Sequence, residues 1–162
     1  MRSIQAIPKK IFSLPELLQK LTVLRLQSRK IVFTNGVFDI FHKGHIASLS
    51  EAASYGDFLI VAVNSDASVK RLKGESRPVN DEQARMLLLA SLLQTDAIIL
   101  FEEDTPLELI KQLMPDVLVK GGDYTVEQIA GAKEVLAAGG EVKLADMVEG
   151  ISTTAIIERM KD

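Results

Sequence analysis

The sequence of 162 residues contains no cysteine. That absence excludes a disulfide framework, an iron–sulfur cluster, a thiolate zinc site and a cysteine nucleophile, and it suits a reducing compartment. The five prolines and ten glycines form no linker-like cluster, and no stretch approaches the roughly 18 apolar residues of a membrane span. The formal net charge of −3 offers no basic excess for a nucleic acid. We therefore expect one compact cytoplasmic domain with neither a nucleic-acid nor a membrane partner.

Short apolar runs alternate with segments of helical periodicity. Buried strands are predicted at Ile31–Thr34, Phe58–Val63, Ala97–Phe101, Val117–Lys120 and Val142–Leu144. Helices are predicted from Ser13 to about Gln27 and at Gly44–Tyr55, Asn80–Gln94, Thr105–Met114, Thr125–Ala138 and Ala155–Met160. This order predicts an α/β fold with a doubly wound parallel sheet of five strands, in which ligands bind beyond the carboxyl ends of the strands.

The chain divides into two regions by this pattern. Residues 1–28 are predicted to be an N-terminal helical extension, whose helix starts at the capping-box sequence Ser13-Leu14-Pro15-Glu16. Residues 29–162 are predicted to be the functional domain. The helix of the extension can pack on that domain or on a second copy of the chain.

The loop after the first predicted strand holds both histidines of the protein, His42 and His45. They stand at the start of a predicted helix, where free amides and the helix dipole favour an anion, and Gly44 between them leaves room for a phosphate. Imidazole donors there can stabilise charge that develops on phosphate oxygens. Two alternatives remain: unrelated surface histidines, and a metal pair, which lacks a third histidine or cysteine ligand.

Three further segments follow predicted strands or precede the last helix. Ser152, Thr153 and Thr154 supply three hydroxyls for phosphates, or an ordinary helix cap. An irregular basic loop is predicted to hold Lys70, Arg71, Lys73 and Arg77, with Arg85 nearby; it fits a substrate phosphate or a solvated face. Lys120-Gly121-Gly122-Asp123 allows close approach of a ligand, or forms a tight turn.

Taken in order, these motifs resemble the cytidylyltransferase-like nucleotidyltransferase superfamily. The resemblance is carried by Asn35-Gly36-Val37-Phe38-Asp39, His42-Lys43-Gly44-His45 and Gly150-Ile151-Ser152-Thr153-Thr154. The segments Val63–Asp66, Lys70–Gly74, Arg77–Asn80, Phe101–Pro106 and Val119–Tyr124 are similar to one branch, the heptose 1-phosphate adenylyltransferase domain of bifunctional kinase/adenylyltransferases, here standing alone. The resemblance implies a Rossmann-like nucleotidyltransferase fold.

The resemblance also implies substrates and site residues. The reaction would join ATP and D-glycero-β-D-manno-heptose 1-phosphate into ADP-heptose and pyrophosphate by direct in-line transfer, for lipopolysaccharide synthesis. The catalytic residues would be His42 and His45. ATP would be bound by Asn35, Gly36, Val37, Phe38, Asp39, His42, Gly44, His45, Lys120, Gly121, Ser152, Thr153 and Thr154. The sugar phosphate would be bound by Lys73, Arg77, Lys43, Asn64, Asp66 and Asp123.

Mg²⁺ is expected to be held mainly by phosphates and water, with Asp39 either near the metal or in a structural role. We expect a homodimer. The alternatives are glycerol 3-phosphate cytidylyltransferase, pantetheine-phosphate adenylyltransferase and a non-catalytic nucleotide-binding module. The cytidylyltransferases carry a phosphate-binding arginine where Met147 stands, and Lys43 is a candidate to replace it.

Overall fold

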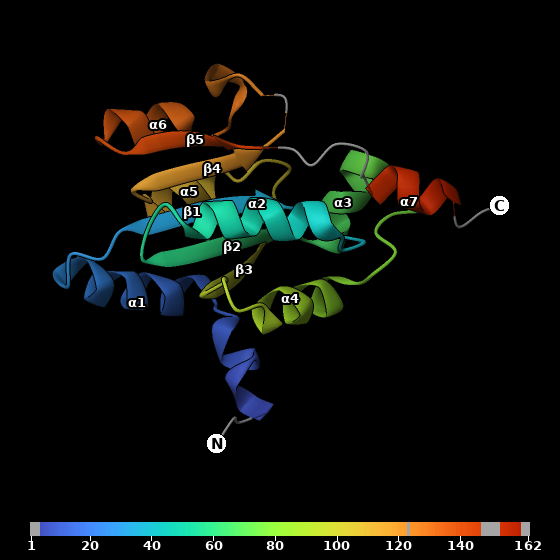
Figure 1. Ribbon diagram of the computed structural model, residues 1–162, viewed down its shortest axis with the longest axis horizontal. Coiled ribbons are helices and arrows are strands. Elements are labelled where there is room, and N and C mark those ends of the chain that lie inside the picture. Colours follow the sequence, from blue (N-terminus) through green and yellow to red (C-terminus); the bar gives the residue numbers. More distant parts are fainter. Residues whose placement is uncertain (1–3, 123, 147–152, 160–162) are drawn as a thin grey trace.

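A parallel sheet of five strands in the order β3-β2-β1-β4-β5 forms the centre of the protein (Figure 1). The computed structural model describes residues 4–122, 124–146 and 153–159. The strands are β1 Ile31–Gly36, β2 Phe58–Asn64, β3 Ala97–Phe101, β4 Val117–Gly121 and β5 Glu141–Ala145. The chain builds β2 and β3 on one side of β1 and then crosses to build β4 and β5 on the other. The predicted doubly wound sheet is therefore confirmed.

Helices cover both faces of the sheet. They are α1 Leu14–Leu26, α2 Lys43–Ala53, α3 Asp66–Lys73, α4 Glu82–Ser91, α5 Leu107–Leu113, α6 Ala132–Ala137 and α7 Thr153–Arg159, with 3₁₀ turns η1 Ile4–Ala6, η2 Pro8–Lys10 and η3 Val126–Gln128. Successive residues of β1 point to opposite faces: Phe33 joins a core with α1, α5 and α6, whereas Val32 joins a core with α2 and α4. No helix in the described part of the chain is long and apolar enough to cross a membrane.

Aspartates fix the amino-terminal edge of the sheet. Asp116 accepts a hydrogen bond from the Ile31 amide at 2.7 Å, and Asp96 accepts one from the Leu59 amide at 2.8 Å. Each carboxylate stands just before one strand and bonds the neighbouring strand, so it sets the parallel register at its start. The opposite, carboxyl edge is left for binding, and α3 and α7 lie beyond it, at the right of Figure 1.

Two predictions of secondary structure are wrong, one of a loop and one of a helix. The basic segment predicted as an irregular loop forms α3 as far as Lys73 and is irregular only after Gly74; its signal was Ser65, whose hydroxyl accepts from the Ser68 amide at 3.1 Å as a helix cap. The helix predicted over Thr125–Ala138 is divided into η3 and α6. Gly131 separates them at φ +85, where a side chain would also meet Ile110 at 2.7 Å.

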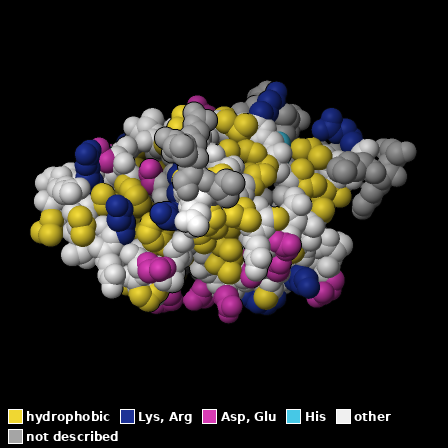
Figure 2. All heavy atoms as spheres, turned by 90° about the horizontal axis from the view of Figure 1, so that it is seen from below, with side chains coloured by type: hydrophobic (Ala, Val, Ile, Leu, Met, Phe, Trp, Pro, Cys, Tyr) yellow, Lys and Arg dark blue, Asp and Glu magenta, His cyan; other side chains and the backbone are white. Residues whose placement is uncertain are grey.

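Charged side chains are mixed over the face shown in Figure 2. Lysine and arginine side chains lie there singly or in small groups, with acidic and apolar side chains between them. The described residues of this face form no basic stripe of the kind that binding along a nucleic-acid backbone requires. Helix α1 contributes to the main core, because Leu17 and Leu21 are both 0% exposed and pack in the cluster that includes Phe33.

That packing predicts a measurable loss of stability. Leu17→Ala leaves a cavity beneath the sheet, so it should lower the free energy of unfolding by about 2–5 kcal/mol. Leu26→Ala, at a site 84% exposed on the same helix, should change it by less than about 0.5 kcal/mol. Urea denaturation followed by circular dichroism measures both. Equal, small effects would mean that α1 is an appendage rather than part of the core.

Candidate active site

A cavity of about 340 Å³ opens at the carboxyl ends of β1 and β4. The strand order reverses between these two strands, which is the point where α/β sheets bind ligands. The cavity is lined by Thr34, Asn35, Gly36, Val37, Phe38, His42, Gly44, His45, Ser48, Leu49, Val119, Lys120, Gly121, Ala145, Asp146 and Thr153. Residues from β1, α2, β4, the end of β5 and the start of α7 thus meet around one space.

The two histidine rings stack on each other in this cavity. Their centroids lie 3.8 Å apart and their planes differ by 19°. His42 is the extended residue that precedes α2, and the amide of His45 donates to its carbonyl at 2.9 Å, so the first helical turn sets the spacing. The rings of Phe38 and Phe41 each lie 5.3 Å from the His45 ring. Aromatic packing therefore holds the pair in place.

Burial makes both histidines hard to protonate. It lowers the pKa of His42, and it lowers that of His45 to about 4, assisted by the charge of His42. The Nδ1 atoms of both rings are buried and have no hydrogen-bond partner within the described part of the chain. An anion in the cavity would raise both pKa values, because it stabilises imidazolium. The two imidazoles can therefore donate hydrogen bonds to a phosphate and, once protonated, also attract it by their positive charge.

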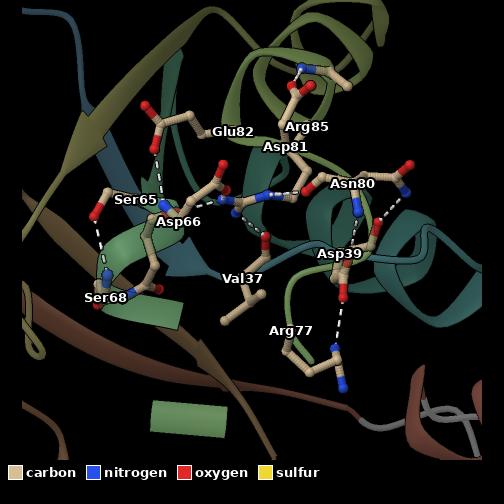
Figure 3. Close-up of polar contacts among 12 residues, drawn as sticks. Val37, Asp39, Ser65, Asp66, Ser68, Arg77, Asn80, Asp81, Glu82 and Arg85 are labelled. Carbon is tan, nitrogen blue, oxygen red and sulfur yellow. Dashed lines mark hydrogen bonds and ion pairs between the residues drawn. The ribbon is translucent and has the colours of Figure 1, made fainter. Parts of the chain in front are cut away.

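The Asp39 carboxylate is fully engaged away from the cavity lining. It accepts from Arg77 Nε at 2.6 Å, from the Val79 amide at 2.9 Å and from the Asn80 amide at 2.9 Å, and it is 3% exposed (Figure 3). Burial alone would raise the pKa of Asp39, but the bonds from Asn80, Val79 and Arg77 outweigh it and lower the pKa. The structural alternative for Asp39 is thereby favoured over a place near a metal.

A buried guanidinium ties the loops around the cavity together. Arg85 is 2% exposed and donates to the carbonyls of Val37 at 2.6 Å, Asn64 at 2.8 Å and Asn80 at 3.0 Å, and to the Asp66 carboxylate at 2.7 Å (Figure 3). These partners lie just after β1, at the end of β2, at the start of α3 and just before α4. One side chain therefore fixes the loop that leads to the histidines.

Lys120 places a positive charge on the β4 side of the cavity. Its Nζ donates to Asn35 Oδ1 at 3.2 Å and has no carboxylate partner in the described residues. Burial, reinforced by the charge of Lys73, lowers the pKa of Lys120. Burial disfavours the protonated form of Lys120, and an anionic ligand bound beside it would stabilise that charged form.

Residues 33–159 match the cytidylyltransferase-like family. The chain belongs to that family. It is therefore a nucleotidyltransferase, and the histidine cavity at the switch between β1 and β4 is the candidate active site of this enzyme.

Curated relatives are similar over most of this chain. The chain is 56% identical over 149 residues to "Bifunctional protein HldE" of Marinomonas sp. (strain MWYL1), covering 92% of this chain and 31% of the relative. It is 57% identical over 146 residues to the same-named protein of Proteus mirabilis (strain HI4320), covering 90% and 31%. The chain thus spans about a third of the length of these relatives.

Solved structures share the fold. A lipopolysaccharide core biosynthesis protein from Thermoplasma volcanium GSS1 is 32% identical with a TM-score of 0.59, covering 74% of this chain and 97% of that chain. The pantoate-beta-alanine ligase of Francisella tularensis has a TM-score of 0.61 at 16% identity, covering 93% of this chain and 76% of that chain. At that identity the second likeness shows the fold alone.

The structure brings ten of the expected site residues to the cavity of this nucleotidyltransferase. They are Asn35, Gly36, Val37, Phe38, His42, Gly44, His45, Lys120, Gly121 and Thr153. Seven others lie outside its described lining: Asp39, Lys43, Asn64, Asp66, Lys73, Arg77 and Thr154. Ser152, Asp123 and the segment that begins at Met147 lie outside the described residues. The hydroxyl of Thr153 donates to the Ile40 carbonyl at 3.4 Å, which brings α7 to the histidine loop.

Several lining residues escaped the sequence analysis. Ser48 and Leu49 follow His45 by three and four residues, so helical spacing could have found them. Ala145 and Asp146 directly follow the predicted strand Val142–Leu144, and the rule that ligands bind at carboxyl ends could have found them. The side-chain bonds of Asp39, Arg77 and Asp66 carry no sequence signal, because their partners are distant in the chain.

The histidine environment predicts a titration measurable by NMR, since the chain holds two histidines only. His45 should titrate near pH 4 and His42 below 6.5. His42→Asn should raise the His45 midpoint, because one repelling charge is gone. The unfolded chain takes up these protons near pH 6.5, so the free energy of unfolding should fall as the pH is lowered from there towards 4. Two midpoints near 6.5 would contradict the buried stack.

The hydrogen bonds of Arg85 predict that replacing this arginine lowers the free energy of unfolding more than replacing an exposed arginine does. Arg85→Met removes the donor of four acceptors, of which the Asn64 carbonyl is buried and the other three are partly buried, and should lower the free energy of unfolding by about 3 kcal/mol. Arg71→Met is the matched control: its side chain is 51% exposed and pairs with Asp104, so the change should stay below about 1 kcal/mol. Urea denaturation compares the two variants. Similar losses would refute the anchoring role of Arg85.

Proposed function

We propose that the chain transfers the adenylyl group of ATP to D-glycero-β-D-manno-heptose 1-phosphate, giving ADP-heptose and pyrophosphate for lipopolysaccharide synthesis. The observation that carries the proposal is the stacked pair His42 and His45, with unpartnered buried nitrogens in a cavity at the switch of strand order. The motifs resemble the heptose 1-phosphate branch, and a lipopolysaccharide core biosynthesis protein of 32% identity supports the same assignment.

The proposed step is an in-line displacement. An oxygen of the sugar phosphate attacks the α-phosphorus of ATP, the new P–O bond forms as the bond to the β-phosphate bridging oxygen breaks, and pyrophosphate leaves with that electron pair. No residue becomes covalently modified. His42 and His45 hydrogen-bond the phosphates and stabilise the charge that moves to the leaving group, while Lys120 adds a fixed positive charge.

The cavity suits a divalent cation that arrives with the nucleotide. Among the described residues no group of three histidine, aspartate or glutamate side chains could hold a metal ion, and both oxygens of Asp39 are already engaged. Mg²⁺ would therefore be held mainly by phosphate oxygens and water. When bound it would neutralise part of the charge of the triphosphate.

We place the enzyme in the cytoplasm, and we propose a homodimer. A fold of this kind without disulfides needs no oxidising compartment. Sedimentation equilibrium of the purified chain tests the dimer: a single species at the monomer mass of 17.8 kDa would reject it.

A substrate panel tests the reaction. Pyrophosphate release is measured with ATP or CTP, each against heptose 1-phosphate, glycerol 3-phosphate and phosphopantetheine. We expect turnover with ATP and heptose 1-phosphate, and product identified as ADP-heptose by mass spectrometry. Strong activity with CTP and none with ATP would reject the adenylyl assignment, and turnover with phosphopantetheine alone would reject the sugar phosphate.

His45→Ala separates an enzyme from a binding module in the same assay. Removing one phosphate donor should lower kcat by about 10²–10³-fold, with the Kd for nucleotide within about tenfold of the parent value. Glu108→Ala is the control, because Glu108 pairs with Lys111 on the exposed side of α5. Unchanged turnover of His45→Ala would overturn the catalytic role.

A further inference from the structure

Glu51 joins the helix of the histidines to the end of the last strand. Its Oε2 accepts a hydrogen bond from the backbone amide of Asp146 at 3.0 Å, and its Oε1 accepts one from the Tyr55 hydroxyl at 2.7 Å. Glu51 lies on α2, six residues beyond His45. The carboxylate therefore spans two elements that are far apart in sequence and meet beside the cavity.

Tyr55 holds the carboxylate in this orientation. The bond to Glu51 raises the pKa of the Tyr55 hydroxyl, so the phenol stays protonated as the donor. Lys143 of β5 places its Nζ 5.9 Å from the centre of the Tyr55 ring. The ring is thus supported by the same strand whose end Glu51 bonds.

The end of β5 needs such a support because β5 is an edge strand. Its ladder runs along β4 alone, where Gly121 pairs with Ala145. Ala145 and Asp146 then form one wall of the cavity, while Ser48 and Leu49 of α2 form another. The backbone bond to Glu51 fixes the first wall to the helix that carries the second.

We propose that Glu51 is a positioning residue for nucleotide binding: it sets the separation between α2 and the Ala145–Asp146 wall of the cavity. Glu51 itself lies outside the described cavity lining, so it acts through the backbone of Asp146. The inference rests on the proposed function only in that the cavity receives a nucleoside triphosphate.

Three variants test how much each bond of Glu51 contributes. Glu51→Ala removes both bonds and leaves the exposed Asp146 amide to water, so the Ala145–Asp146 wall loses its link to α2. The KM for ATP should then rise about fivefold while kcat changes less than about threefold. Tyr55→Phe removes the supporting hydroxyl and should raise KM by about two- to threefold. Glu51→Gln can accept from Asp146 and donate to Tyr55, so it should stay within about twofold of the parent chain.

Asp57→Ala is the matched control. The Asp57 carboxylate also accepts one backbone amide across elements, that of Lys30 at 2.8 Å, and one side chain, Arg29 at 3.2 Å. It lies at the amino-terminal edge of the sheet, opposite the cavity. Asp57→Ala should lower the melting temperature without changing the KM for ATP.

The Kd for nucleotide, measured by calorimetry with whichever of ATP or CTP the parent chain binds, gives a readout that needs no sugar phosphate. A parent chain that binds nucleotide yet makes no ADP-heptose would reject the proposed function and leave this test intact. The proposal is supported if Kd and KM rise most in Glu51→Ala, less in Tyr55→Phe and least in Glu51→Gln. It is overturned if Glu51→Ala loses kcat at constant KM, or if it changes KM no more than Asp57→Ala does. If Glu51→Ala does not fold, an unchanged Kd in Tyr55→Phe overturns it.

Discussion

The position of β1 between β2 and β4 is the constraint on which the site depends. All strands are parallel, so their carboxyl ends share one edge, and the chain leaves β1 in one direction before returning on its other side. Connections that diverge from neighbouring strands leave a space between them. The cavity, the start of α2 and the end of β4 all follow from that reversal.

Buried polar groups around this space divide into two kinds. Asp39 and Arg85 are satisfied by several partners each, and they lock the loops that follow β1 and β2. The histidine Nδ1 atoms have no partner in the described residues, and the pKa of Lys120 is lowered by burial. A buried group without a partner costs free energy, so rigid surroundings must hold it ready for a ligand. The satisfied network supplies those surroundings.

The sequence was informative where the signal is local. Apolar runs such as Phe58–Val63 predicted the strands within one or two residues of their observed ends, and the predicted pair His42 and His45 lies in the lining of the cavity. It was uninformative where a partner lies far along the chain. Arg77 was predicted to bind the sugar phosphate, yet its side chain bonds Asp39, which lies 38 residues earlier. The polar α3 was missed because it buries little apolar surface, with Val69 as its fully buried aliphatic residue.

The folded structure also decides how much positive charge the cavity presents, because burial changes the pKa values of its basic groups. From sequence, two histidines and a lysine suggest three cations, but burial lowers the pKa of each group. Near pH 7 the imidazoles are therefore neutral, and their attraction for phosphate comes first from N–H donors. An incoming polyanion then favours protonation of the stacked pair, and the gain is greatest as charge moves onto a leaving phosphate. In the proposed reaction such a cavity stabilises the transition state more than the ground state, and that difference is what catalysis requires.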